Sequence, residues 1–145
     1  MLKTDKPIVI ELQIVKSSNI VWEAITDPNH MRLWFFEQIK NFEPKVEFET
    51  LFIVQVEDRV YPHRWKIIDV IPEQKIVYDW SYDGYEGKAI VTFELKSNET
   101  TTNLTLTNVV KESFPQNVPE FSREMCIQGW EYFTNRLKKY VETAI

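Results

Sequence analysis

Two histidines are the residues best suited to acid–base or metal chemistry in this chain of 145 residues. His63 falls in a run that reads as a strand, on the same alternating phase as Tyr61 and Trp65, so its imidazole could face a cavity as a general acid or base. No second group stands at a diagnostic spacing, which favours a hydrogen-bonded residue of the cavity wall over a catalytic one. His30 is the only other histidine and belongs to a different element, so a His-rich metal site is not expected.

The carboxylates and the single thiol show no arrangement typical of an active site. Most glutamates of the strand-like runs fall on the solvent phase, and Asp79 lies between Tyr78 and Trp80 and therefore on the outer face. The lone Cys126 cannot form an internal disulfide, which fits a reducing compartment and a role as a small core residue. The chain has no Gly-rich phosphate loop, nucleophile elbow or paired-cysteine motif. We therefore expect no catalytic residues, no metal and no cofactor.

Three uncharged polar residues fall where apolar ones would be expected. Asn108 and Thr50 share the inward phase of their strands, and Gln128 lies one residue from the apolar stripe of the last helix. Buried polar groups require partners, which can be each other, water or a ligand. A cavity wall satisfied by water and a role in orienting a ligand both remain open.

The elements that must position these residues follow from hydrophobic periodicity. Alternating apolar residues predict a strand at 7–15, and helical spacing predicts two short helices, one after Ser17 and one that begins at Asp27-Pro28. Further strands are expected at 46–56, 60–71, 75–82, 88–96 and 102–110, and a long amphipathic helix at 119–143. Its apolar stripe is expected to recur every four residues, from Phe121 through Met125 and Gly129 to Val141. A sheet with one apolar face must be covered, and only this helix is large enough to cover it.

Large rings occupy one phase of these strands. Tyr78, Trp80 and Tyr82 alternate on one run, and Phe93 lies between Val91 and Leu95 on the next. Rings on one phase converge on one side of a curved sheet, so they predict an aromatic interior. Such rings are most often core residues, and a pocket between sheet and helix is the alternative that we carry forward.

Composition limits the partners of the chain. The net charge of −5 argues against a nucleic-acid surface, which needs clustered Lys and Arg. The N-terminus has no apolar stretch of signal-peptide length, and no window approaches the roughly 18 apolar residues of a membrane span. We expect one cytoplasmic domain over residues 1–145 with no membrane span.

Several segments in order resemble one known family. Residues 21–28, read as Val-Trp-Glu-Ala-Ile-Thr-Asp-Pro and followed by Trp34-Phe35, are similar to the N-terminal signature of the activator of heat-shock protein 90 ATPase homologue-like (AHSA-type) family. Segments 65–68, 75–80 and 91–95 and the pair Gly129-Trp130 fit in order. That family belongs to the START/SRPBCC (Bet v 1-like) superfamily.

The resemblance implies an α+β helix-grip fold. Such a fold has a bent antiparallel sheet of six or seven strands, two short helices after the first strand and a long C-terminal helix packed across the sheet. Its members include hydrophobic-ligand binders, polyketide cyclases and chaperone activators, so it implies a fold more strongly than a function.

We expect non-catalytic binding of a small hydrophobic or aromatic molecule between the sheet and the long helix. One alternative is a cyclase- or aromatase-type enzyme that uses His63 in the same pocket; another is a co-chaperone that activates a chaperone ATPase. The co-chaperone ranks last because the eukaryotic activators carry an additional N-terminal domain. The residues expected to line the pocket and its entrance lie on the inward phase of the sheet and on the helix stripe: Trp34, Phe52, His63, Trp65, Trp80, Tyr82, Phe93, Asn108, Phe121, Met125, Gly129 and Phe133.

Overall fold

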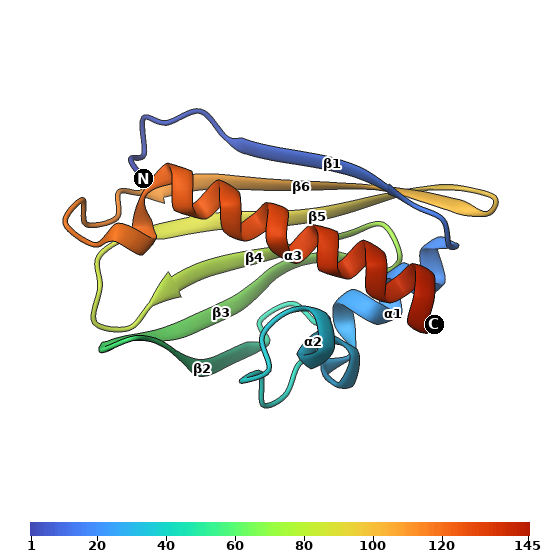
Figure 1. Ribbon diagram of the computed structural model, residues 1–145, viewed down its shortest axis with the longest axis horizontal. Coiled ribbons are helices and arrows are strands. Elements are labelled where there is room, and N and C mark those ends of the chain that lie inside the picture. Colours follow the sequence, from blue (N-terminus) through green and yellow to red (C-terminus); the bar gives the residue numbers. More distant parts are fainter.

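Six antiparallel strands form one curved sheet in the computed structural model, which describes residues 1–145 (Figure 1). The strands are β1 (Ile8–Ile14), β2 (Glu49–Val56), β3 (Arg59–Ile71), β4 (Lys75–Tyr82), β5 (Lys88–Asn98) and β6 (Thr101–Glu112). Their order in the sheet is β1-β6-β5-β4-β3-β2, so consecutive hairpins run from β2 to β6 and β1 closes the far edge. The predicted helix-grip fold is confirmed, with six strands.

The helices lie on one face of the sheet. The two short ones are α1 (Ser18–Thr26) and α2 (Pro28–Trp34), and the long one is α3 (Arg123–Ala144), which crosses the strands diagonally (Figure 1). The Asp27 carboxylate accepts a hydrogen bond from the Asn29 amide at 2.8 Å, and Pro28 occupies the first turn of α2, as the sequence predicts. No helix is both long and apolar enough to cross a membrane.

Two predicted boundaries are corrected. The expected helix at 119–143 begins as a separate 3-10 turn, η1 (Pro119–Phe121), and Ser122 then caps α3 by accepting from the Met125 amide at 3.2 Å. The strand expected at 46–56 begins only at Glu49, because Glu47 has φ of 77°. This left-handed conformation interrupts the extended backbone before β2.

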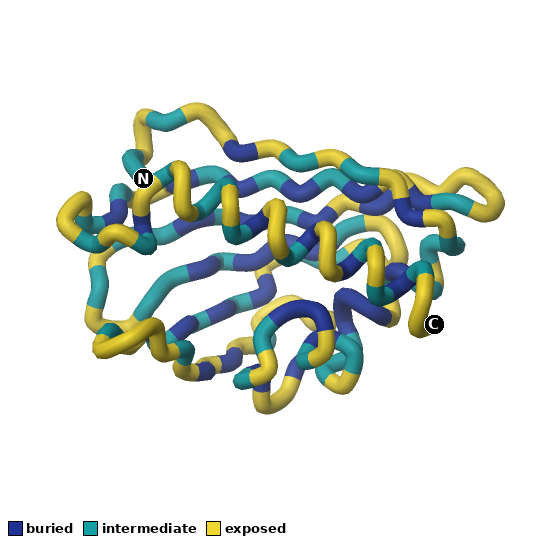
Figure 2. The backbone as a smooth tube through the Cα atoms, viewed as in Figure 1, coloured by how far each residue is buried: buried dark blue, intermediate teal, exposed yellow.

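Alternation along the strands separates a buried face from an exposed one (Figure 2). On β3 the residues Tyr61, His63, Trp65 and Ile67 are all buried, while their neighbours in sequence are partly or fully exposed. A bulge after Ile67 shifts the register with β4, and Ile68, which follows Ile67 in the alternation, is exposed. The rings therefore do point to the side that α3 covers, as their phase predicts.

The loop between β4 and β5 contains two glycines with positive φ, at +87° for Gly84 and +113° for Gly87. A Cβ atom built on Gly84 meets nothing, whereas one on Gly87 overlaps the ring of Phe114. The positive φ disfavours other residues at both positions, but only at Gly87 would a side chain also overlap a neighbouring residue.

We expect Gly87→Ala to lower the free energy of unfolding more than Gly84→Ala. Backbone strain alone costs on the order of 1–3 kcal/mol at either position, and displacement of Phe114 adds to it at Gly87. Urea unfolding of both variants measures the difference. Equal losses would show that the contact with Phe114 is unimportant.

Candidate ligand-binding cavity

A cavity of about 120 Å³ lies between the sheet and the first half of α3. Its sheet wall consists of His63 on β3, Trp80 and Tyr82 on β4, Ala89 on β5 and Asn108 on β6. Strand pairing places His63 opposite Tyr82 and Trp80 opposite Ala89. These side chains meet because they occupy the same face of adjacent strands.

The helix wall consists of Cys126, Gly129, Trp130 and Phe133. At about 100° per residue, Cys126 lies about 20° around α3 from the fully buried Leu137, whereas Met125 lies about 120° away. Met125 is accordingly 46% exposed and does not line the cavity. The predicted four-residue repeat drifts by about 40° at each step, so it leaves the buried face within a few turns.

The remaining lining residues come from loops, from η1 and from the N-terminus. They are Met1, Phe36, Phe114, Glu120 and Phe121. The ammonium of Met1 donates to the Phe121 carbonyl at 2.6 Å, which ties the N-terminus to η1.

One charged lining residue is held by an ion pair. Glu120 accepts a hydrogen bond from the guanidinium of Arg59 on β3. Burial acts to raise the pKa of Glu120, but the hydrogen bond from Arg59 and its positive charge oppose this, and the pKa lies below its usual value. The carboxylate therefore stays ionised and engaged with Arg59 at neutral pH.

His63 is buried and neutral. Its Nδ1 lies 2.9 Å from the Tyr61 carbonyl, which can only accept, so the proton sits on Nδ1 and Nε2 keeps its lone pair. Burial lowers the pKa of His63 to about 4, although the hydrogen bond to Tyr61 opposes this shift. At neutral pH the ring is therefore an acceptor at Nε2.

Asn108 is a further polar residue of the cavity wall. Its Nδ2 lies 3.5 Å from the Sγ of Cys126, whereas its Oδ1 is buried and has no hydrogen-bond partner. Burial raises the pKa of the Cys126 thiol to about 11, so the sulfur is protonated and neutral at pH 7. Nearby, the Tyr82 hydroxyl accepts from the Trp80 indole at 2.9 Å.

Seven of the twelve residues named from sequence line this cavity: His63, Trp80, Tyr82, Asn108, Phe121, Gly129 and Phe133. Met125 is exposed, and the other four, Trp34, Phe52, Trp65 and Phe93, are core residues that are at most 1% exposed.

Two rings separate those core residues from the cavity. Phe35 and Phe36 follow α2, and Phe36 lies 5.2 Å from Phe52 and 6.2 Å from Trp65 between ring centroids. Phe35 lies 5.5 Å from Trp65. The expectation that Trp65 and its neighbours face open space is therefore corrected.

The sequence interpretation missed seven lining residues: Met1, Phe36, Ala89, Phe114, Glu120, Cys126 and Trp130. Helical spacing alone could have identified Cys126 and Trp130, since both share a face with Leu137. Glu120 lies in the predicted helix at 119–143 but off its apolar stripe, and Phe114 lies between two periodic runs, so hydrophobic periodicity indicates neither.

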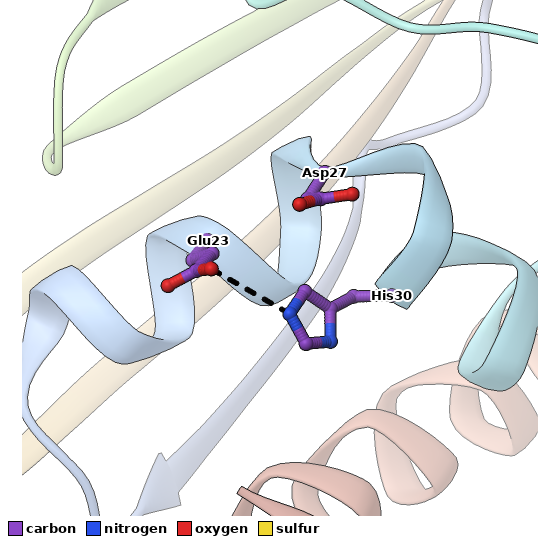
Figure 3. A group of neighbouring side chains, drawn as sticks. All are labelled: Glu23, Asp27 and His30. Atoms are coloured by element: carbon purple, nitrogen blue, oxygen red, sulfur yellow. Dashed lines mark ion pairs between the residues drawn. The ribbon is translucent and has the colours of Figure 1, made fainter.

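A separate group joins α1 to α2 and α3. The ligand atoms of Glu23, Asp27 and His30 lie within 4.8 Å of one another, and Figure 3 shows Glu23 and His30 directed toward each other, 3.7 Å apart. One imidazole and two carboxylates are a donor set that could hold a divalent transition metal. The spacing of four and three residues was the signal for this group in the sequence.

The contacts of this group account for it without an ion. Asp27 caps α2, Glu23 is largely exposed and pairs with His30, and Nδ1 of His30 lies 2.5 Å from the Tyr140 hydroxyl of α3. We interpret it as the junction that fixes the three helices to one another.

Comparisons with known proteins agree with this architecture. The family model described as "Activator of Hsp90 ATPase homolog 1-like protein" matches residues 17–142. No curated protein sequence matches the chain.

Solved structures with the same fold share little sequence with it. DynU16, a protein in the dynemicin biosynthetic locus, has a TM-score of 0.76 at 22% identity; the match covers 97% of this chain but only 48% of DynU16. A Chromobacterium violaceum protein has a TM-score of 0.76 at 19% identity, covering 94% of this chain and 96% of the other. The Aha1 dimer from Colwellia psychrerythraea has a TM-score of 0.70 at 18% identity, covering 96% and 98%. At these identities the likeness shows the fold alone.

The neutral state of His63 predicts a pH dependence of stability. The imidazole has a pKa of about 4 when folded and an ordinary value of 6.5, so between these values the unfolded chain binds the proton more tightly. This contribution to stability is complete above about pH 6.5 and is lost as the pH falls toward about 4. Because of this loss, we expect the free energy of unfolding to fall by on the order of 2–3 kcal/mol between about pH 7 and about pH 4.5.

The variant His63→Phe keeps a ring and cannot titrate, so its stability should fall less over the same range. Urea unfolding of both proteins at the two pH values isolates this residue from the carboxylates, which titrate in both. Identical losses would contradict a neutral, buried His63.

Proposed function

The chain belongs to the family of activator of Hsp90 ATPase homolog 1-like proteins, and from that premise we propose that it binds a small, largely apolar or aromatic molecule in the cavity. One observation carries the proposal: Gly129, in the middle of α3, lies against the cavity, and a Cβ built on it would meet nothing. Glycine within a helix costs about 1 kcal/mol relative to alanine. No close contact requires glycine at this position. The absence of a side chain instead leaves open space beside the cavity.

The character of the walls supports an apolar guest. The two walls bring together the rings of Trp80, Tyr82, Trp130 and Phe133, and the other lining residues add those of Phe36, Phe114 and Phe121. Aromatic rings offer large contact areas with few rotatable bonds, which suits the recognition of another ring. The few polar groups, His63, Tyr82 and Asn108, would orient a polar substituent.

A cyclase- or aromatase-type reaction is the second candidate, because His63 lies buried beside the cavity with a polar partner. Its pKa of about 4, however, makes the imidazole a weak base at neutral pH. General acid–base catalysis works best with a pKa near the working pH. Binding without chemistry therefore ranks first.

Chaperone activation is the third candidate and rests on the family description and on the similarity to the Aha1 dimer. It predicts that the chain recovers a chaperone ATPase in a pull-down and stimulates its turnover. We expect the cytoplasm as the compartment because Cys126 is a single free thiol.

Filling the space at Gly129 tests the binding function. We expect Gly129→Leu to abolish binding of small aromatic compounds without lowering stability, because the new side chain occupies the cavity and leucine favours the helix. Asn135→Leu places the same leucine side chain at an exposed position of α3 and should bind as the wild type does.

Binding is measured by NMR titration with a panel of single-ring compounds, and native mass spectrometry tests the wild type for a copurified molecule. If no compound binds the wild type, or if Gly129→Leu binds as well as the wild type, the proposed function fails.

A further inference from the structure

We propose that the guest of this cavity is a single aromatic ring that carries a hydrogen-bond donor, such as a phenolic hydroxyl, and that Nε2 of His63 accepts that donor. The inference rests on the proposed function and deepens it, because it names the class of molecule that the cavity takes. It is carried by the volume of the cavity and by an acceptor on the sheet wall that no protein group uses.

The volume of the cavity sets the size of the guest. Pockets for drug-sized molecules measure roughly 300–1,000 Å³, whereas an engineered cavity of about 150 Å³ with apolar walls binds benzene. At about 120 Å³, the present cavity matches one ring with a small substituent. A polycyclic molecule would need the walls to move.

Contacts on several sides fix the imidazole of His63. Its Nδ1 donates to the Tyr61 carbonyl at 2.9 Å, which leaves the lone pair on Nε2. The ring stacks on Phe52 with centroids 5.0 Å apart, and the rings of Phe36 and Tyr82 lie 4.9 Å and 4.7 Å away. Because the imidazole is held by these neighbours, its acceptor is oriented before a guest arrives.

Nε2 of His63 is open to the cavity. It has no hydrogen-bond partner in the protein, and it is not one of the four side-chain atoms that are both fully buried and unpaired, which are Tyr61 Oη, Trp65 Nε1, Tyr78 Oη and Asn108 Oδ1. It therefore keeps accessible surface. Since His63 lines the cavity and is only 6% exposed, that surface faces the cavity.

An acceptor in this position discriminates between guests of equal size. A water molecule can satisfy Nε2 when the cavity holds no guest. A guest with a donor replaces the hydrogen bond of that water, whereas a guest without one displaces the water and leaves Nε2 unpaired. Sites that present an acceptor in this way reject analogues that lack the donor.

Other polar groups of the lining are already engaged or can only donate. The Tyr82 hydroxyl oxygen accepts from the Trp80 indole at 2.9 Å, and the Glu120 carboxylate accepts from Arg59. The Met1 ammonium donates to a backbone carbonyl and has no acceptor, so it does not compete for a proton of the guest. It could bind the oxygen of a guest, and the experiment must separate that contact from the one at His63.

The experiment compares phenol, anisole and toluene, which have similar size but of which only phenol donates a hydrogen bond. The Met1 ammonium could donate to the oxygen of both phenol and anisole, so the comparison of these two isolates the proton that the guest donates. Dissociation constants are obtained from NMR titrations of the wild type and of His63→Phe. We expect the wild type to prefer phenol, and His63→Phe to reduce the preference for phenol over anisole by roughly 3- to 10-fold, the effect of one net hydrogen bond.

The acceptor can also be observed directly in the wild type. Long-range ¹H–¹⁵N correlation spectra report both nitrogens of each imidazole, and we expect phenol, but not anisole, to shift the Nε2 resonance of His63. His30 pairs with Glu23 outside the cavity lining, so its resonances serve as the internal control. This measurement needs no variant and remains decisive if His63→Phe does not fold.

A matched control variant removes the other histidine. His30→Gln leaves the cavity lining unchanged, so it should keep the full preference for phenol over anisole.

The outcomes separate the inference from the proposed function. Binding with no preference for phenol over anisole, or phenol binding that leaves the Nε2 resonance of His63 in place, overturns this inference and leaves the binding function standing. A preference that survives in His63→Phe overturns it as well, and points to the Glu120 carboxylate as the acceptor. If none of the compounds binds, the proposed function fails and the inference fails with it.

Discussion

The packing of Phe35 and Phe36 between the sheet and α3 determines how the interior is divided. Phe35 lies 4.9 Å from Phe133, 5.5 Å from Trp65 and 5.9 Å from Trp130 between ring centroids, so it touches both layers at once. Arg32 on α2 holds the segment that follows these rings, because its guanidinium donates to the carbonyls of Ile39 and Lys40. The segment that follows α2 thus places two aromatic rings between the sheet and α3.

The position of Phe35 and Phe36 explains why the cavity is small and lies at one end of α3. Where Phe35 and Phe36 enter, the rings of the sheet pack against them and form continuous core. Beyond Phe36 the nearest side chains come from α3. Trp130 and Phe133 contribute rings there, but Cys126 has only a small side chain and Gly129 has none. A curved sheet and a straight helix separate along their length, and the chain fills that gap at one end only.

Periodicity alone was sufficient for the fold and insufficient for the site. Alternation and the Asp27-Pro28 cap predicted the strands and the first helices, because each depends on local geometry that the residue types reveal. The same alternation brought His63, Trp80 and Tyr82 to one wall. It could not show that Phe36 covers Trp65 and Phe52, because the segment after α2 is irregular and its path depends on tertiary contacts. Met125 was misplaced for a different reason: a strict four-residue repeat is not the period of a helix.

The polar residues of the cavity bear on whether it serves binding or chemistry. A catalytic histidine needs a pKa near neutrality, and the burial that encloses the cavity moves the pKa of His63 away from it. Gly129 in α3 costs the folded protein about 1 kcal/mol relative to alanine, because glycine disfavours the helix. What this glycine provides is open space beside the cavity, which a bound molecule could fill. A site built for holding a molecule has use for these features, whereas a proton-transfer site would need His63 to be wetter or to lie beside a charge.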